Sequence, residues 1–354
     1  MDHEISEILK QQGIERFGFA ELNRPLTMDF YLSWLADSKH GEMSYLQTHA
    51  EKKSNPQLLL PKANSAIVVA LSYLPHPEPH VSKSFKAART ALYSRGKDYH
   101  HWMQARLNEV CGALKLKYPK YEFLSFVDSG PVLERDLARR AGLGWIGKNT
   151  CLIHPKQGSL FFIGEIYTNL SLKNDQPMVT DHCGTCQKCI EICPTGALAE
   201  RSLDARKCIS YLTIESKSVP PRELRGQIGD WLFGCDLCQT VCPWNIKFFK
   251  KEIYLESQEL NRADLVSDLN FILSSSNKML AKTFKDSSLS RASGNKLKRN
   301  AIIVIANKKL IELKEMVTSY QEHKYFSELC LWAIKELNDG AVNSHCVRPS
   351  NLRE

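Results

Sequence analysis

The 354-residue sequence lacks any apolar run that approaches the roughly 20 residues needed to cross a bilayer. The apolar stretch Ala66–Leu71 is soon followed by Pro75, and the first residues, Met1-Asp2-His3-Glu4, lack the charged and apolar regions of a secretory signal. We therefore expect no membrane partner. Because thiolates held for metal need a reducing compartment, the cysteine motifs and the missing signal together predict a cytoplasmic protein.

Four cysteines and a proline form the most specific motif of the chain. Cys183, Cys186, Cys189 and Cys193-Pro194 are spaced C-x2-C-x2-C-x3-C-P, the run with which bacterial ferredoxins hold iron–sulfur clusters. The alternative is zinc, but zinc ribbons usually pair two C-x2-C knuckles across a spacer. The run therefore favours a protein that transfers single electrons.

A second run downstream is incomplete. It keeps the last three cysteines, and Leu232 stands where the first would be, so Cys208 is the obvious replacement. Eight thiolates suffice for two [4Fe–4S] clusters. Because the fourth cysteine of each run crosses to the other cluster in two-cluster ferredoxins, we assign Cys183, Cys186, Cys189 and Cys242 to the first cluster and Cys193, Cys208, Cys235 and Cys238 to the second.

The remaining cysteines and the histidines show no ligand spacing. A free cysteine is most often a small buried hydrophobe, and a lone histidine is more often structural than a metal ligand. We therefore assign no role to Cys111, Cys151, Cys330 and Cys346.

The chain is long enough for two or three units. β-like runs at 66–71, 121–127 and 160–167 alternate with helical patterns at 101–117 and 132–141, which predicts an α/β domain over residues 1–172. We expect a two-cluster ferredoxin-like module over residues 173–250. Helical patterns such as 298–307 and 325–338 predict an α-helical region over residues 251–354.

Asp128 ends one of the predicted strands and faces a turn made by Gly130-Pro131. A carboxyl group in such a position can donate a proton if its pKa is raised. A lone aspartate there is more often the N-cap of the next helix, and the pattern alone favours the cap. Three glycines further on would allow the backbone to approach a large flat ligand, but they follow a helix and so form no dinucleotide fingerprint: Gly142, Gly144 and Gly147.

The net charge of +8 is unevenly placed. Between Asn277 and Leu310, nine lysines and arginines stand against a single acid, Asp286. Such a stretch would attract a polyanion such as a nucleic acid. A charge run alone is more commonly a solvated face, so nucleic-acid binding does not follow from charge by itself.

Three segments together resemble the epoxyqueuosine reductase family: V-D-S-G-P-V-L-E-R at 127–135, A-G-L-G-W-I-G-K-N at 141–149, and the first cysteine run. Residues 53–56, 93–100 and 242–245 extend the resemblance, which becomes loose beyond about Phe249. It implies an oxidoreductase with cobalamin and two [4Fe–4S] clusters, related to reductive dehalogenases. Such enzymes reduce epoxyqueuosine to queuosine at the tRNA wobble position, the last step of queuosine biosynthesis.

The resemblance also implies roles for individual residues. Asp128 matches the family's proton donor, and Lys53 stands where the family often has arginine. The cobalamin contacts implied by matching positions are Lys53, Ser94, Asp128, Leu133, Glu134, Arg135, Ile146, Asn149, Ser210, Cys235 and Asp236. Implied tRNA contacts near the site are Lys217, Ser218, Pro220, Arg222 and Arg225, and the basic stretch, with Lys296, Lys298 and Arg299, would hold the stem through phosphates.

The C-terminal helices resemble a short series of HEAT-like repeats, and we expect a monomer that takes electrons from an external donor. Two other functions stay open. A reductive dehalogenase would share the chemistry but would act on a small molecule, which has no need of a basic region. A simple electron carrier would need neither cobalamin nor Asp128.

Overall fold

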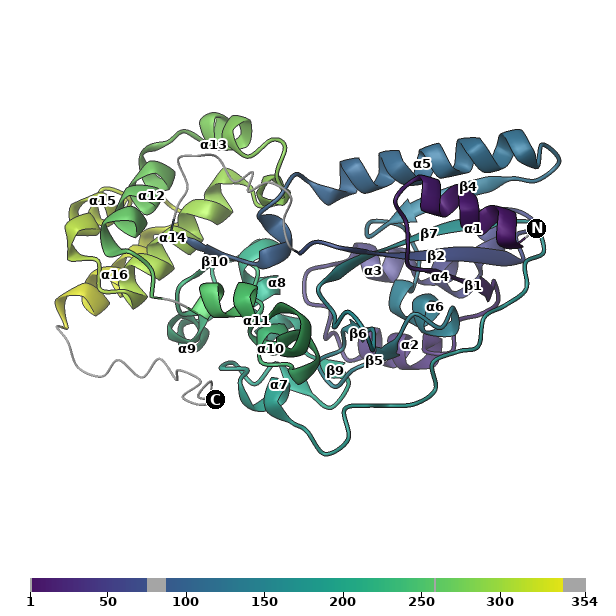
Figure 1. Cartoon of the computed structure of the whole chain (residues 1–354). Coiled ribbons are helices and arrows are strands. Elements are labelled where there is room, and N and C mark those ends of the chain that lie inside the picture. The colour runs from purple at the N-terminus through teal and green to yellow at the C-terminus, as the bar shows by residue number, and fades with distance from the viewer. Residues whose placement is uncertain (1, 75–86, 258, 340–354) are drawn as a thin grey trace.

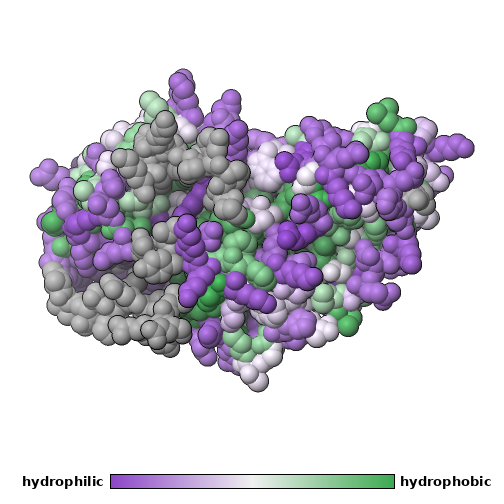
Figure 2. All heavy atoms as spheres, in the orientation of Figure 1, coloured by the Kyte–Doolittle hydropathy of each residue, from purple (hydrophilic) through white to green (hydrophobic). Residues whose placement is uncertain are grey.

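The computed structural model describes residues 2–74, 87–257 and 259–339, so Cys346 and the end of the predicted helical region lie outside the described residues. A sheet domain and a helical region lie at opposite ends of an elongated molecule, and the cysteine-rich segment lies between and below them (Figure 1). The face seen in that view is largely hydrophilic, with smaller hydrophobic areas (Figure 2). No helix among the described residues is long and apolar enough to span a membrane.

The central sheet has four strands in the order β1-β2-β7-β4. Their bounds are Phe17–Glu21 (β1), Ser65–Ser72 (β2), Phe123–Val127 (β4) and Phe161–Thr168 (β7). The three strands expected from the sequence are present, but every neighbouring pair is antiparallel. An antiparallel sheet makes the domain α+β rather than α/β. The prediction of an α/β domain was wrong because the alternation of strands and helices along a chain does not by itself fix strand direction.

Helices cover both faces of this sheet. Asp2–Gln11 (α1) and Tyr99–Lys117 (α5) bury Ile5, Met103 and Leu107 against one face, and Glu134–Arg140 (α6) buries Leu137 against the other. Gly164 lets α5 lie close to β7, because a Cβ there would stand 2.6 Å from Met103 Cε. The shorter helices of the domain are Met28–Ala36 (α2), Tyr45–Thr48 (α3), Ala50–Ser54 (α4), Pro56–Leu58 (η1) and Leu92–Ser94 (η2).

The glycines after α6 let neighbouring chain segments pack closely. A Cβ at Gly144 would lie 2.3 Å from the Ile153 carbonyl oxygen, and one at Gly142 would lie 2.9 Å from that of Gln176. This close packing positions the small hairpin formed by Trp145–Ile146 (β5) and Leu152–Ile153 (β6).

The cysteine-rich segment consists of short elements, because ligand-bearing loops leave little room for long ones. They are Lys188–Glu191 (α7), Leu198–Ala199 (β8), Ser202–Leu203 (β9), Ala205–Lys207 (η3), Ile209–Ile214 (α8), Arg222–Arg225 (α9), Gly226–Ile228 (η4), Trp231–Phe233 (β10), Leu237–Thr240 (α10) and Pro243–Ser257 (α11), which is kinked at Phe249. Strand β10 pairs in parallel with Arg89–Thr90 (β3).

The helical region is built around Gly294–Asn307 (α14), which is buried without interruption from Leu297 to Ala306. Around it lie Arg262–Ser274 (α12), Asn277–Thr283 (α13), Ser288–Arg291 (η5), Ile311–Leu313 (η6), Lys314–Thr318 (α15) and Ser327–Asn338 (α16). The two helices expected here are present. One hydrophobic core joins this region to residues 205–233, so the packing does not follow the predicted boundary at residue 250.

Three residues expected to hold tRNA have partners inside the protein. Arg299 has 0% exposure and donates to the carbonyl oxygens of Leu212, Ser216 and Ser218 at 2.5, 2.8 and 2.6 Å. The prediction that Arg299 lies on a basic surface is therefore wrong. Lys298 is buried against the Tyr320 hydroxyl, and half-buried Lys296 donates to the carbonyls of Ile214 and Glu215.

Replacing Arg299 should therefore cost stability. In Arg299→Met the alkyl volume remains but three buried carbonyls lose their donor, so the free energy of unfolding should fall by about 3 kcal/mol. Anaerobic denaturant unfolding measures this, with exposed Lys282→Met as the matched control. A loss below about 0.5 kcal/mol for Arg299→Met, typical of surface substitutions, would contradict the buried role.

Candidate active site

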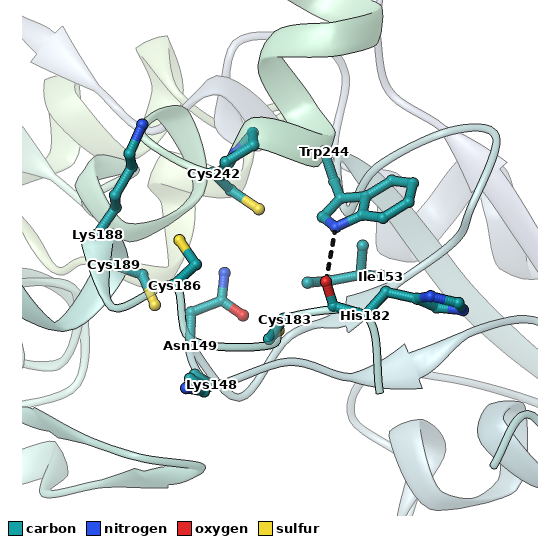
Figure 3. A pocket seen from close by; sticks show the side chains of 11 residues that line it. Lys148, Asn149, Ile153, His182, Cys183, Cys186, Lys188, Cys189, Cys242 and Trp244 are labelled. Carbon is teal, nitrogen blue, oxygen red and sulfur yellow. Dashed lines mark hydrogen bonds between the residues drawn. The ribbon is translucent and has the colours of Figure 1, made fainter. Parts of the chain in front are cut away.

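The four thiols assigned to the first cluster converge on one cavity. Cys183, Cys186, Cys189 and Cys242 line a space of about 140 Å³, with side chains gathered around a common centre (Figure 3). The first three come from the loop around α7 and the last from the turn before α11. A cysteine of the second run thus lies in the same cavity as three cysteines of the first run.

Aromatic side chains wall this cavity on one side. Trp244 Nε1 donates to the His182 carbonyl oxygen at 3.4 Å (Figure 3), and its ring lies 5.0 Å from that of Trp145. Trp145 and Ile153 form a small apolar core with Cys242. Such a shell limits the access of water, which tunes the potential of a bound cluster.

The other four thiols form a second group. Burial raises the pKa of Cys235 well above its ordinary value, and the nearby thiols of Cys208 and Cys193 raise it further. Burial also raises the pKa of Cys238, with Cys235 and Cys208 among its neighbours. Loading with iron would therefore release protons from these thiols.

The spacing of the thiols bears on the zinc alternative. Among residues 2–74, 87–257 and 259–339, no three His, Cys, Asp or Glu side chains come close enough to hold one metal ion. Zinc would require four ligand atoms at about 2.0–2.3 Å from a single centre. Four thiols that line one cavity form the kind of ligand set that a cluster uses, in which each thiol ligates a different iron.

Asp128 lies just beyond β4, and it is not an N-cap. Helix α6 begins after Leu133, and Asp128 itself has a φ of +45°, a backbone conformation uncommon for a residue with a side chain. Its carboxyl is 44% exposed, and Oδ2 lies 2.8 Å from His100 Nε2. Strained backbone of this kind concentrates at functional sites.

The charge on Asp128 is compensated from two directions. Burial raises the pKa of Asp128, but the hydrogen bond and charge of His100 and the charge of Arg291 outweigh it, so the pKa is lowered. Arg291 Nη1 lies 3.8 Å from Asp128 Oδ2, and Arg291 Nη2 lies 3.7 Å from Glu215 Oε1. The sequence analysis expected Asp128 to donate a proton if its pKa were raised, but its neighbours lower the pKa instead.

His100 and Arg291 were missed as site residues in the sequence. His100 stood only within the segment 93–100 that carries the resemblance, and Arg291 only within the basic stretch. The signal that could have identified His100 is its place two residues after Asp98, which is the N-cap of α5. Nothing local in the sequence indicates that Arg291, 191 residues away, reaches His100.

Several residues expected to hold cobalamin lie around Asp128. Burial lowers the pKa of Lys53, whose charge interacts with Glu134, Arg135 and Asp128. Burial and the charge of Asp128 raise the pKa of Glu134 to about 8. Glu165, which the sequence analysis missed, has 0% exposure, and neither carboxyl oxygen has a hydrogen-bond partner among the described residues. Burial raises its pKa well above the ordinary value.

The other expected contacts lie toward the second cysteine group. Asn149 Nδ2 donates to the Cys238 carbonyl oxygen at 3.2 Å. Buried Asp236 accepts from the backbone amide of Leu92 at 2.5 Å, and Leu92 lies two residues before Ser94. Ile146 lies in β5, Ser210 in α8 and Leu133 before α6. The structure thus links the surroundings of Asp128 to the cysteine loops.

A two-cluster cysteine module joined to a buried group of titratable side chains defines an iron–sulfur oxidoreductase. Residues 182–245, which include all eight assigned cysteines, match the family of 4Fe-4S double cluster binding domains, and residues 53–129 match the QueG family of epoxyqueuosine reductases. The chain is 33% identical to the epoxyqueuosine reductase of Escherichia coli K12 over 345 residues, covering 94% of this chain and 90% of that protein. The chain belongs to the epoxyqueuosine reductase family.

Solved structures of the family resemble this chain over almost its whole length. An epoxyqueuosine reductase of Bacillus subtilis, solved with its catalytic aspartate loop swung out of the active site, has a TM-score of 0.80 and 30% identity, covering 95% of this chain and 90% of its own. A reductase solved with an epoxyqueuosine-modified tRNA stem loop has a TM-score of 0.78, 30% identity and the same coverage.

The place of Cys208 in the second group gives a direct test. Cys208→Ala should lower bound iron from about eight to about four atoms per chain, because one cubane loses a ligand. Iron analysis and electron paramagnetic resonance of the anaerobic protein measure this. The matched control replaces Cys330, a buried cysteine of α16, and Cys330→Ala should keep its full iron content. Full iron in Cys208→Ala would remove Cys208 from the ligand set.

Proposed function

We propose that this protein reduces epoxyqueuosine to queuosine at the wobble position of tRNA. The observation that carries the proposal is the likeness, over 95% of the chain, to a reductase solved with an epoxyqueuosine-modified tRNA stem loop. The cysteine module and the charged group around Asp128 supply what such a reduction needs: a route for electrons and a source of protons.

When bound, the two clusters would supply electrons one at a time, and cobalamin would supply the cobalt that reacts with the modified nucleoside. The chain's polar groups fit an amide-bearing cofactor. Lys53, 8% exposed, donates to the Val132 carbonyl oxygen at 2.8 Å and has further ammonium hydrogens, and buried Glu165 has two unpartnered carboxyl oxygens among the described residues. The residues proposed to hold cobalamin are those that the resemblance implies.

Asp128 is the proposed group that delivers a proton to the departing oxygen. Removal of an epoxide oxygen as water consumes two electrons and two protons, and an acid within hydrogen-bond reach accelerates the loss of a poor leaving group. Asp128 suits this role because its carboxyl is partly exposed while its partner His100 lies behind it. An electron donor outside the chain completes the reaction.

The proposed tRNA surface is smaller than the sequence suggested. Lys217, Ser218 and Arg222 are exposed, whereas Pro220 and Arg225 are buried. The backbone of Lys217 is anchored by Glu42 and by the Tyr325 hydroxyl, so a fixed loop presents its side chain. Among residues of the basic stretch, Lys278, Lys282 and Lys285 are also exposed. Phosphate contacts from such side chains position RNA without reading its sequence.

The remaining expectations complete the proposal. Helices α12 to α16 would form a short HEAT-like layer behind this surface, and residues 1–172, 173–250 and 251–354 would serve as cofactor, electron-transfer and tRNA-contacting units. We place the protein in the cytoplasm, because eight thiolates held for clusters require reducing conditions. A monomer would suffice, since every proposed site residue comes from one chain.

Anaerobic turnover tests the reaction. Protein loaded with clusters and cobalamin, given a strong reductant and an epoxyqueuosine-bearing stem loop, should yield a nucleoside lighter by one oxygen, and omission of cobalamin should abolish the change. Asp128→Asn should slow turnover by about 10²-fold or more, since it removes the acid. Exposed Asp37→Asn is the control. Unchanged turnover in Asp128→Asn would exclude the proposed role.

Stem-loop binding tests the proposed tRNA surface. The double variant Lys217→Glu with Arg222→Glu should bind more weakly and reduce the slope of log affinity against log salt by about 1 to 2, because two phosphate contacts are lost. Lys120→Glu with Lys156→Glu has the same charge change at exposed positions elsewhere and should bind normally. Equal binding by both double variants would place the RNA on another face.

A further inference from the structure

His100 is held between two carboxylates. Its Nδ1 lies 2.6 Å from Asp98 Oδ1, and its Nε2 lies 2.8 Å from Asp128 Oδ2. Asp98 also accepts from the His100 backbone amide at 3.1 Å and donates its own backbone amide to the Asp286 carbonyl oxygen at 2.8 Å. The imidazole therefore has a fixed orientation at the start of α5.

This geometry restricts where protons can be. Asp98 only accepts when ionised, so Nδ1 carries a hydrogen. Between Nε2 and Asp128 Oδ2 there is then room for one further proton, on either atom. Arg291 Nη1 lies 3.1 Å from Nε2 and can only donate. When the proton is on Nε2, Asp128 is a carboxylate and Arg291 faces its negative charge. When the proton is on Oδ2, Nε2 has a free lone pair and can accept a hydrogen bond from Asp128 or from Arg291.

Both arrangements carry the same total charge, so exchange between them requires only a short proton shift. Asp128 is the outer member, with a side chain 44% exposed, and His100 is the inner one, at 15%. An oxygen that gains negative charge beside Oδ2 would favour the form in which Asp128 carries the proton. The pair of His100 and Asp128, rather than the Asp128 carboxyl alone, can therefore hold a transferable proton at neutral pH.

We propose that His100 is a proton-relay residue, which stores the proton that Asp128 delivers and restores it from solvent after each transfer. The proposal rests on the proposed function. As the carbon–oxygen bond breaks, the electron pair stays with oxygen and Oδ2 gives up its proton. Two such transfers supply the two protons of the water formed, and the reductant supplies both electrons through the clusters.

Electrostatics support this assignment. Burial lowers the pKa of His100, but Asp128 and Asp98 outweigh it and raise the pKa to about 9. The stored proton is therefore present at neutral pH and is lost as pH rises through about 9. Besides these three, the charged or titratable groups that act on Asp128 or its neighbours include Tyr93, Tyr99, His101, Arg291, Glu134, Arg135, Lys53, Glu165, Tyr45 and Glu215.

The test is the pH dependence of turnover in His100→Gln, which keeps polar contacts but carries no titratable proton. Turnover should fall by about 10²-fold at pH 7 and recover as pH falls toward about 4, where a lone Asp128 carboxyl binds its own proton. Asp98→Asn should move the high-pH limb downward with a smaller loss. The neighbouring exposed residue provides the control, His101→Gln, whose profile should match the native one.

Imidazole titration by NMR, on protein without substrate, gives a reading independent of turnover. The His100 resonance should titrate near 9 and move downward in Asp98→Asn. An unshifted His100 titration, or a His100→Gln profile like the native one, would overturn the relay while leaving the proposed function intact. If native protein fails to turn over, the proposed function fails, and the titration still decides whether the pair holds the proton.

Discussion

Compensation of negative charge at the end of the sheet is the constraint on which the site depends. Removing water from a carboxylate is costly unless an opposite charge or a proton replaces it. Asp128 is compensated by His100 and Arg291, whereas Glu165 has no hydrogen-bond partner among the described residues and burial raises its pKa well above the ordinary value. Because Arg291 comes from the helical region and His100 from α5, this compensation also ties the two ends of the molecule together.

The same logic explains how the helical region shapes the cysteine module. Arg299 and Asn300 on α14 donate to carbonyl oxygens between Leu212 and Leu232, in the segment that separates Cys208 from Cys235. These buried donors satisfy backbone carbonyl oxygens that water does not reach. The positive charge of Arg299, which looked like part of an RNA surface in the sequence, thus binds backbone carbonyls in the segment between Cys208 and Cys235.

The two-cluster module could be predicted because its cysteine spacing is local, and the strands because their apolar runs are local too. The antiparallel order could not, since neighbouring strands such as β2 and β7 are separated by other elements whose path the pattern does not specify. The partners of Asp128 also required the fold, because His100 and Arg291 approach it from positions far apart in the chain. Burial of Arg299 likewise followed from packing, as charge alone suggests exposure.

Leu232, which stands where the second run lacks a cysteine, has 0% exposure within β10 and packs in the core shared with the helical region. A cysteine at position 232 would therefore have its side chain buried in that core. If Cys208 ligates the second cluster, that cluster would link the chain covalently from residue 193 to residue 238 and enclose the loop with Lys217 and Arg222. Such a link would join the proposed tRNA-contacting loop to the electron-transfer module, so that loss of the cluster would remove one of the constraints on the loop while the contacts of Lys217 with Glu42 and Tyr325 remain.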